Sequence, residues 1–374
     1  MIPVFSNTLE TEELKAVSEV FKSRWVGKGK QCDAFEREFA EHLKVPQVLL
    51  LNCCTSAIYV GLRALGIGPG DEVIISTVNF VACASAIIDM GATPVFADVD
   101  PRTLNILPGE IERLTTQRTK GVFILHYGGH PCPMDEIRAN CRNGVAILED
   151  SANAISSSYK GEMCGTIGDA GFWSFDAMKI LVMTDGGALY LRDDEAFTRA
   201  RIYRYLGLAP KTTSGMDAMG EKKTRWWEYE LATTSGRFTS NDCLAAIGRV
   251  QLKKLPEFIA RRRQIWEYYQ REFADLPGLE CPPEPLPGTA SSHYLYWVQL
   301  PKGRDELAVY LAENDVYTTF RYFPLHLVEY YEADCRLPNA EQVNETTLSL
   351  PLHQNLTDAD VSKIVDLVKS FFLR

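Results

Sequence analysis

The sequence predicts an α/β protein whose larger part is built on a mixed, mostly parallel sheet and is followed by a smaller α+β unit. Two observations support this fold class. Short apolar runs of strand length alternate with helix-like segments along the first two thirds of the chain, a pattern typical of parallel sheets. With 374 residues and 46% hydrophobic side chains, the chain is also long and apolar enough to bury a large core.

The predicted elements of the larger part follow one another in a regular order. Two amphipathic helices, at residues 10–22 and 32–43, precede the first strand. The strands are expected at residues 47–52, 72–76, 94–100, 122–126, 145–148, 170–175 and 188–191. Because the ends of parallel strands meet at one edge of a sheet, polar side chains that follow these strands should lie close together, where open α/β sheets bind ligands.

The character of the sequence changes near residue 255. A charged helix at 261–273, a proline-rich link, a strand at 293–300 and helices at 306–314 and 358–372 follow. We therefore predict a large domain at residues 1–254 and a small domain at residues 255–374. Residues 205–232 are polar and broken by glycines, yet they carry clustered aromatic side chains. This composition favours an ordered loop that faces a partner or the substrate.

Charge and cysteine content exclude several functional classes. The formal net charge is −10 with acids and bases mixed along the chain, so we expect neither nucleic acid nor a membrane as a partner. The sequence has no long apolar run and no leader-like N-terminus, which predicts a cytoplasmic protein. The ten cysteines and six histidines are scattered rather than spaced as metal ligands, so no metal site is predicted.

Three polar residues near predicted strand ends indicate the chemistry of the site. Asp150 and Ser174 follow apolar runs, and Lys179 lies amid small and apolar neighbours, where burial would lower the pKa of its amine. Such an amine forms Schiff bases, a carboxylate can keep a pyridinium nitrogen protonated, and a serine can donate to a phosphate. Together they predict a pyridoxal 5′-phosphate site. Taken singly, Asp150 is equally compatible with a helix cap and Lys179 with a surface side chain.

The motifs around these residues resemble the signature of a known family. Glu-Asp-Ser-Ala-Asn-Ala begins at Glu149, Gly-Asp-Ala-Gly-Phe-Trp-Ser-Phe begins at Gly168, and Asp-Gly-Gly begins at Asp185. With Lys179 between the last two, this order resembles the DegT/DnrJ/EryC1/StrS family of sugar aminotransferases over nearly the whole chain. The resemblance implies the aspartate aminotransferase-like fold, fold type I of the pyridoxal phosphate-dependent transferases, and a homodimer with shared active sites.

The resemblance also implies the residues that bind the cofactor. Thr55 and Ser56 match a Gly-Thr-x-Ala stretch that cradles the phosphate at a helix N-terminus, although Cys54 stands at the glycine position. Phe80 matches an aromatic residue that covers the pyridine ring. Asn153 stands where family members usually have glutamine, near the phenolic oxygen of the ring. Ser174 is expected to donate to the phosphate.

Other positions are implied to lie near the substrate or to support the site. Trp25 opens a glycine-broken segment that borders the active site in the family, and Tyr322 and His326 belong to a loop ending Pro-Leu-His that faces the substrate. His126 matches a loop near the cofactor and is expected to support the site rather than to catalyse. Arg237 matches the position from which the neighbouring subunit reaches the phosphate, usually with asparagine or lysine, and its guanidinium can bind phosphate bidentately.

The predicted reaction is the transfer of an amino group to a nucleotide-linked keto-deoxysugar, with the cofactor in its pyridoxamine phosphate form during turnover. The expected donor is L-glutamate, and the favoured reaction is 4-amination of a dTDP-4-keto-6-deoxyhexose for antibiotic or surface-glycan biosynthesis. The nucleotide and the choice between the 3- and 4-positions stay open. So do two other classes, a sugar dehydratase on the same fold, in which histidine replaces the lysine, and a non-catalytic regulatory member. The intact Asp150, Ser174 and Lys179 disfavour both.

Overall fold

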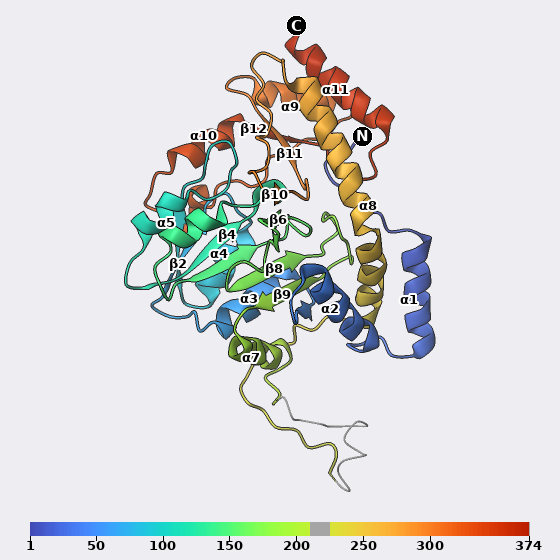
Figure 1. Ribbon diagram of the computed structural model, residues 1–374, viewed down its shortest axis with the longest axis vertical. Coiled ribbons are helices and arrows are strands. Elements are labelled where there is room, and N and C mark those ends of the chain that lie inside the picture. Colours follow the sequence, from blue (N-terminus) through green and yellow to red (C-terminus); the bar gives the residue numbers. More distant parts are fainter. Residues whose placement is uncertain (210–224, 374) are drawn as a thin grey trace.

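A seven-stranded mixed sheet forms the centre of the structure, a computed structural model that describes residues 1–209 and 225–373 (Figure 1). Its strand order is β1-β9-β8-β5-β4-β2-β3. The strands are β1 Leu49–Leu51, β2 Glu72–Ser76, β3 Thr93–Ala97, β4 Thr119–Leu125, β5 Ala146–Asp150, β8 Ala170–Ser174 and β9 Gly187–Leu191. Neighbours from β8 to β3 pair in parallel, and β9 is antiparallel to β8 and β1. The predicted mostly parallel sheet is confirmed.

Helices cover both faces of this sheet, which explains why its central strands are continuous apolar runs. The helices are α3 Cys54–Ala64, α4 Val81–Asp89, α5 Pro108–Leu114, α6 Met134–Asn140 and α7 Asp194–Arg204. Successive side chains of a strand point to opposite faces. Val73 and Ile75 of β2 accordingly join the core beneath α3, α4 and α7, while Ile74 joins the separate core beneath α5 and α6.

A long helix connects this large unit to a smaller one. α8, Asp242–Phe273, packs along α1, Thr11–Ser23, and α2, Lys30–Leu43 (Figure 1). Leu255 and Phe258 of α8 belong to the main core, whereas Ile265 and its C-terminal part belong to the core of the small unit. The predicted domain boundary at residues 254/255 thus falls inside an unbroken helix. The division at that residue stays a prediction.

The small unit is built around a two-stranded antiparallel sheet of β11, Tyr296–Gln299, and β12, Thr347–Leu350. The remaining elements are η1 Tyr127–Gly129, β6 Ser158–Tyr159, β7 Glu162–Met163, β10 Thr289–Ala290, α9 Arg304–Glu313, η3 Leu325–Leu327, η4 Glu329–Tyr331, α10 Pro338–Thr346 and α11 Asp358–Phe372. Among the described residues, no helix combines the length and the apolar character needed to cross a membrane.

The segment at 205–232 is described only at its two ends, since residues 210–224 lie outside the described part of the chain. Its two described ends extend from the body beside α7 (Figure 1). Leu208 and Leu231 form an isolated antiparallel bridge, so the described ends run side by side. Trp227 and Tyr229 are 60% and 68% exposed, which leaves this segment with aromatic side chains that nothing in the described subunit covers.

Candidate active site

A cavity of about 310 Å³, here called the inner cavity, lies at the carboxyl ends of β5 and β8. Six residues singled out in the sequence line it, namely Thr55, Phe80, Asp150, Ser174, Lys179 and Tyr322. They come from the start of α3, the start of α4, the ends of two strands, the loop between β8 and β9, and the small unit. The topology therefore brings together residues that are up to 267 positions apart, between 55 and 322.

Asp150 lies at the end of β5 and is 4% exposed. Its Oδ1 accepts a hydrogen bond from the Ala152 N–H at 3.0 Å, and its Oδ2 accepts one from the Cys83 thiol at 3.5 Å. Burial raises the pKa of Asp150, and the Ala152 N–H and the Lys179 amine offset only part of that rise. The carboxylate thus lies in a position that favours a further cationic or proton-donating partner.

Lys179 lies in the loop between β8 and β9, and its amine is close to one amide oxygen and one aromatic ring. Its Nζ donates to Asn153 Oδ1 at 3.3 Å and lies 4.9 Å from the centre of the Tyr294 ring. Burial lowers the pKa of Lys179, but interactions with Tyr294, Tyr322 and Asp150 outweigh it and raise the pKa above its usual value. The predicted lowering of this pKa is wrong, because the local sequence shows the apolar neighbours but not the distant polar groups.

The N-terminus of α3 forms one wall of the inner cavity. Cys53 caps the helix with its sulfur, which accepts a hydrogen bond from the Ser56 N–H at 3.4 Å. Thr55 lines the cavity, whereas Ser56 is 8% exposed and its hydroxyl lies 3.2 Å from the Cys53 sulfur. Unpaired N–H groups and the helix dipole favour an anion at this end.

A glycine lets the helix start approach the sheet closely. A Cβ on Gly187, the first residue of β9, would lie 2.4 Å from both the Cys53 carbonyl carbon and the Cys54 nitrogen. Any larger residue at Gly187 would therefore push the turn away from the sheet. Cys54 replaces the glycine of the family pattern, but the close approach is made possible here by the glycine on the opposite strand.

Two aromatic side chains lie at the entrance of the cavity. Phe80, the N-cap of α4, is 50% exposed, and its ring centre lies 5.8 Å from that of Tyr322.

Ser174 ends β8, and its Oγ accepts a hydrogen bond from the Asp176 N–H at 3.4 Å. The cavity therefore combines a flat apolar side with hydroxyl groups at its edge.

The residues present fit pyridoxal phosphate. Asn153 is 1% exposed, and its Nδ2 has no hydrogen-bond partner among the described residues, so a buried donor is available beside Lys179. An amine, a deeply buried carboxylate and a helix N-terminus lie around one cavity whose volume is at the lower end for small-molecule sites. These groups match an aldehyde, a ring nitrogen and a phosphate, respectively.

Five predicted residues do not line the inner cavity of the described subunit, namely Ser56, Asn153, Trp25, Arg237 and His326. Trp25 is 61% exposed and donates through Nε1 to the Lys28 carbonyl at 2.9 Å. Arg237 is exposed, and its guanidinium lies 5.9 Å from the centre of the Tyr205 ring. His326 is 6% exposed, and its Nδ1 lies 2.8 Å from the Thr77 hydroxyl.

The pair Glu149 and His126 is buried beside the site. The Glu149 carboxylate lies 2.9 Å from His126 Nε2 and accepts hydrogen bonds from the backbone N–H groups of Gly165 and Gly168. Glu149 and Asp150 are neighbours in a strand, so their side chains point to opposite faces. Only Asp150 reaches the cavity, and the contacts of His126 agree with a supporting position.

Sequence reasoning missed several residues of the inner cavity, above all Arg321, Met178 and Cys83. Arg321 directly precedes Tyr322 in the loop ending Pro-Leu-His, and Met178 directly precedes Lys179. Proximity in sequence to the predicted residues was therefore the available signal for these two. Cys83 had no such signal, because only the packing of α4 against β5 brings its thiol to Asp150.

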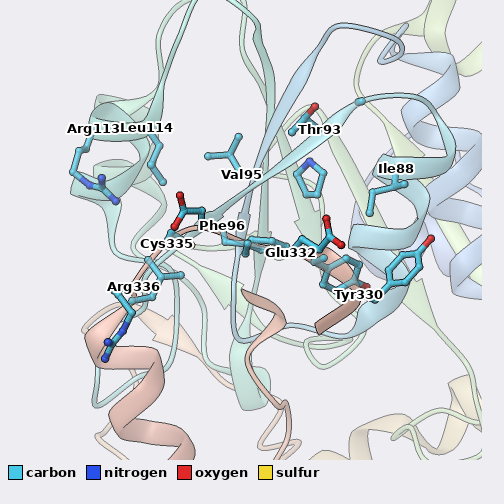
Figure 2. Close-up of a pocket in the computed structure, with 16 residues that line it drawn as sticks. Ile88, Thr93, Val95, Phe96, Arg113, Leu114, Tyr330, Glu332, Cys335 and Arg336 are labelled. Atoms are coloured by element: carbon cyan, nitrogen blue, oxygen red, sulfur yellow. The ribbon is translucent and has the colours of Figure 1, made fainter. Parts of the chain in front are cut away.

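A second and larger hollow, here called the outer cleft, lies on the surface beside β3, α4 and α5 (Figure 2). Its volume is about 910 Å³, and Arg113, Tyr330, Glu332, Cys335 and Arg336 are among the residues that line it. The cationic side chains there are already paired: Arg113 with Glu110 at 2.6 Å and Arg336 with Glu341 at 2.5 Å. Both arginines of the larger hollow thus have acidic partners, unlike Arg321 of the inner cavity.

Comparisons with known proteins agree with this geometry. Residues 7–369 match the model of the DegT/DnrJ/EryC1/StrS aminotransferase family. A curated relative from Saccharopolyspora spinosa, dTDP-4-dehydro-2,3,6-trideoxy-D-glucose 4-aminotransferase, is 48% identical over 370 residues, which cover 98% of this chain and 95% of the relative.

Solved structures also resemble the chain throughout. The aminotransferase TlmJ from Streptoalloteichus hindustanus is 47% identical with a TM-score of 0.93, over 99% of this chain and 98% of that one. The putative sugar aminotransferase Spr1654 from Streptococcus pneumoniae, in its PMP form, is 26% identical with a TM-score of 0.92, over 100% and 99% of the two chains.

The fold class and enzyme class predicted from the motifs are confirmed by these matches, which extend over both units of the structure. The fold is that of the pyridoxal phosphate-dependent aminotransferases, and the inner cavity lies at the strand ends around which the motifs were found. The chain belongs to the DegT/DnrJ/EryC1/StrS aminotransferase family.

Proposed function

We propose that this protein is a pyridoxal phosphate-dependent aminotransferase that converts a nucleotide-linked keto-deoxysugar into an amino-deoxysugar. The observation that carries the proposal is that Lys179 and Asp150 line one cavity at the strand ends, with Asn153 buried beside the Lys179 amine. The lysine also supports a transaminase over a dehydratase of the same fold. The PMP form of the Streptococcus pneumoniae neighbour supports the choice of cofactor.

Lys179 is assigned the central chemical role. Its amine would hold pyridoxal phosphate covalently when the cofactor is bound, and it would move a proton at the Cα of the amino donor as general acid and base. Pyridoxal phosphate supplies, when bound, an electron sink for the carbon that loses this proton. The short loop after β8 keeps the amine beside Asn153, whose Oδ1 accepts from it at 3.3 Å.

Asp150 and Asn153 are assigned to the cofactor ring. Asp150 would hold a proton on the ring nitrogen of bound pyridoxal phosphate, the kind of cationic partner that its buried carboxylate favours. The hydrogen bonds from Ala152 and Cys83 fix both carboxylate oxygens in place. Asn153 donates its unpaired Nδ2 proton to the phenolic oxygen. Phe80 covers one face of the ring.

Thr55, Ser56 and Ser174 are assigned to the phosphate. Thr55 and Ser174 line the cavity, and the N-terminus of α3 adds backbone N–H groups and a favourable dipole. Ser56 is directed to the Cys53 sulfur in the described structure, so its hydroxyl turns toward the phosphate in this assignment. The phosphate thus fixes the cofactor at one end and Asp150 at the other.

The proposed substrate is a dTDP-4-keto-6-deoxyhexose, with L-glutamate as the amino donor. The name of the Saccharopolyspora spinosa relative, a 4-aminotransferase of a dTDP-linked sugar at 48% identity, supports this choice. Tyr322 lines the cavity and is assigned to substrate binding. Substrate contacts of Trp25 and His326, a cytoplasmic location and a role in antibiotic or surface-glycan biosynthesis stay predictions.

A homodimer with shared active sites completes the proposal. Arg237 and Trp25 are exposed and lie outside the inner cavity of their own subunit, although the family pattern assigns them to the active site. The exposed aromatic side chains of the segment at 205–232 offer a surface for a second copy. In a twofold dimer, each subunit sends Arg237 to the phosphate of its neighbour.

The test is incubation of the purified protein with L-glutamate and a panel of 3- and 4-keto sugars linked to dTDP, UDP or GDP. We expect an amino sugar at C4 of the dTDP-linked substrate, identified by mass and by NMR. Borohydride treatment of the loaded protein should attach the cofactor irreversibly to Lys179, located by peptide mapping. A cofactor that washes out after borohydride, together with no amino-sugar product, would reject the proposed function.

A further inference from the structure

Arg321 is a cation that lines the inner cavity without an ion-pair partner among the described residues. It lines the same cavity as Lys179. Within residues 1–209 and 225–373, its guanidinium forms no ion pair, and its one recorded side-chain hydrogen bond runs from Nη2 to the Met178 sulfur at 3.2 Å. A thioether is a weak acceptor, so most of the donor capacity of the guanidinium is unused.

The guanidinium is nevertheless held in place. Its Cζ lies 4.6 Å from the centre of the Phe5 ring and 5.9 Å from that of the Tyr322 ring, within the range of cation–π attraction. The Tyr127 hydroxyl donates to the Arg321 carbonyl, and Thr319, two residues earlier, pairs with Ser349 of β12. An arginine that is ordered before a ligand arrives loses less entropy on binding it.

We propose that Arg321 binds a carboxylate of the amino donor. A planar guanidinium with free N–H groups matches a carboxylate with two parallel hydrogen bonds. This inference rests on the proposed aminotransferase function and names the group that recognises its donor.

The position of Arg321 favours the donor carboxylate over the diphosphate of the sugar nucleotide. Its guanidinium contacts Met178, the residue next to Lys179. In an α-amino acid, the carboxylate is attached to the same carbon whose proton Lys179 moves. In a nucleotide-linked 4-keto sugar, the diphosphate is separated from the reacting carbon by the sugar ring. The contact of Arg321 with Met178, within the cavity that Lys179 also lines, therefore fits the smaller separation.

The first experiment measures binding without turnover. Glutarate, which has carboxylates but no amine to react, and thymidine diphosphate are titrated by calorimetry into the cofactor-loaded wild type and into Arg321→Gln. We expect glutarate to bind roughly 10- to 150-fold more weakly to the variant, the usual worth of a charged hydrogen bond. The affinity for thymidine diphosphate should change by less than about twofold, since no phosphate contact is removed.

A matched control and a second variant accompany this measurement. Arg271 is also stacked on a tyrosine, at 4.9 Å from Tyr268, but it is paired with Glu272 and does not line the inner cavity. Arg271→Gln should therefore leave both affinities unchanged. Arg321→Lys keeps the charge without the planar fork and should bind glutarate with intermediate affinity. It also supports the comparison if Arg321→Gln does not fold.

The second experiment identifies the carboxylate. Single-turnover conversion of the cofactor is followed by absorbance with L-glutamate, with L-isoglutamine, which lacks the α-carboxylate, and with L-glutamine, which lacks the γ-carboxylate. The donor that lacks the group bound by Arg321 should react much more slowly than glutamate in the wild type but about equally with glutamate in Arg321→Gln. If the rate difference between glutamate and isoglutamine disappears in Arg321→Gln, Arg321 binds the α-carboxylate. If the rate difference between glutamate and glutamine disappears instead, Arg321 binds the γ-carboxylate.

Several results overturn the inference. Equal glutarate affinity of wild type and Arg321→Gln does so, as does a loss confined to thymidine diphosphate, which would assign the diphosphate instead. The failure of the proposed function is separate and recognisable. A wild type that converts its cofactor with none of the three donors rejects the aminotransferase, while the glutarate titration still decides whether Arg321 binds carboxylates.

Discussion

The inner cavity and the outer cleft differ in whether their arginines have acidic partners. The outer cleft has about 910 Å³ and the inner cavity about 310 Å³, so size alone would favour the outer one. In the outer cleft, Arg336 is paired with Glu341 and is 85% exposed. In the inner cavity, Arg321 has no acidic partner and Asp150 has no cation within ion-pair distance among the described residues.

This difference favours the inner cavity over the outer cleft as the site of the reaction. Buried or half-buried charges without partners cost free energy in the empty protein, and a ligand that neutralises them recovers it. Paired charges on an open surface cost little free energy and contribute little to stability. The predictions below test this contrast, beginning with the change expected to have the largest effect.

Lys179→Ala should abolish transamination, because covalent attachment of the cofactor and movement of the donor proton both depend on one amine. We expect turnover to fall by several orders of magnitude while weak cofactor binding persists. The assay is amino-sugar formation from L-glutamate, with cofactor content measured after dialysis. If the variant retained even a tenth of wild-type turnover, Lys179 would have no chemical role.

Asp150→Asn should retain the cofactor but lose most turnover, since a neutral amide cannot hold the proton on the ring nitrogen. A loss of about a hundredfold or more in kcat is expected, which is the lower range for a proton-holding group. Steady-state kinetics and the absorbance spectrum of the bound cofactor are the measurements. A normal kcat would assign Asp150 to structure alone.

Arg237→Ala tests whether the inner cavity is complete within one subunit. If the neighbour's Arg237 binds the phosphate, the variant should bind the cofactor more weakly by about 1.5 to 3 kcal/mol, the worth of a charged hydrogen bond. Cofactor affinity is measured by fluorescence quenching of the apoprotein, and sedimentation should show a dimer.

Mixing Arg237→Ala with the inactive Lys179→Ala provides the control for shared sites. In a mixed dimer of Arg237→Ala and Lys179→Ala subunits, one site carries both changes and the other carries neither. Partial activity should therefore return after subunit exchange. An active monomer, or no recovery despite proven exchange, would make Arg237 an ordinary surface residue.

Acid should destabilise the buried core before it affects the outer cleft. Burial lowers the pKa of His130 to about 3 from a usual 6.5, so the unfolded chain binds a proton between these values and the folded chain does not. Stability is therefore complete above pH 6.5 and falls below it, by about 1.4 kcal/mol per pH unit for one such histidine. Urea unfolding at pH 7.0, 6.0 and 5.0 measures the slope.

His130→Phe should reduce that slope, and Glu341→Gln is the matched control. The Arg336 guanidinium holds the pKa of Glu341 at about 2, so its stabilising effect is present above the usual pKa of 4.5 and is lost as the pH falls from there toward 2. The slope between pH 5 and 7 should therefore be unchanged in Glu341→Gln. Equal slopes in wild type and His130→Phe would mean that other groups control acid stability.

The smallest effect is expected from Arg336→Ala in the outer cleft. The Arg336 side chain is 85% exposed, so breaking its pair with Glu341 should leave kcat and cofactor affinity within about twofold of the wild type. The same aminotransferase assay and the apoprotein titration apply. A loss greater than about tenfold would reverse the contrast and give the outer cleft a binding role.

The sequence by itself determined the order of the elements and the place of the chemistry. The alternation of apolar runs with helical segments is a local property, and the seven strands of the central sheet fall on the predicted runs. A residue that ends a parallel strand must lie at the carboxyl edge of the sheet, so Asp150 and Ser174 could be placed before the structure was known.

Only the tertiary structure decided which side chains surround those residues. The raised pKa of Lys179 depends on Tyr294, Tyr322 and Asp150, which are distant in sequence, whereas its neighbours along the chain are apolar. His326 and Tyr322 belong to one predicted loop, yet only Tyr322 lines the inner cavity. The direction of a side chain and the charge around it are set by long-range packing, and local sequence patterns do not contain that information.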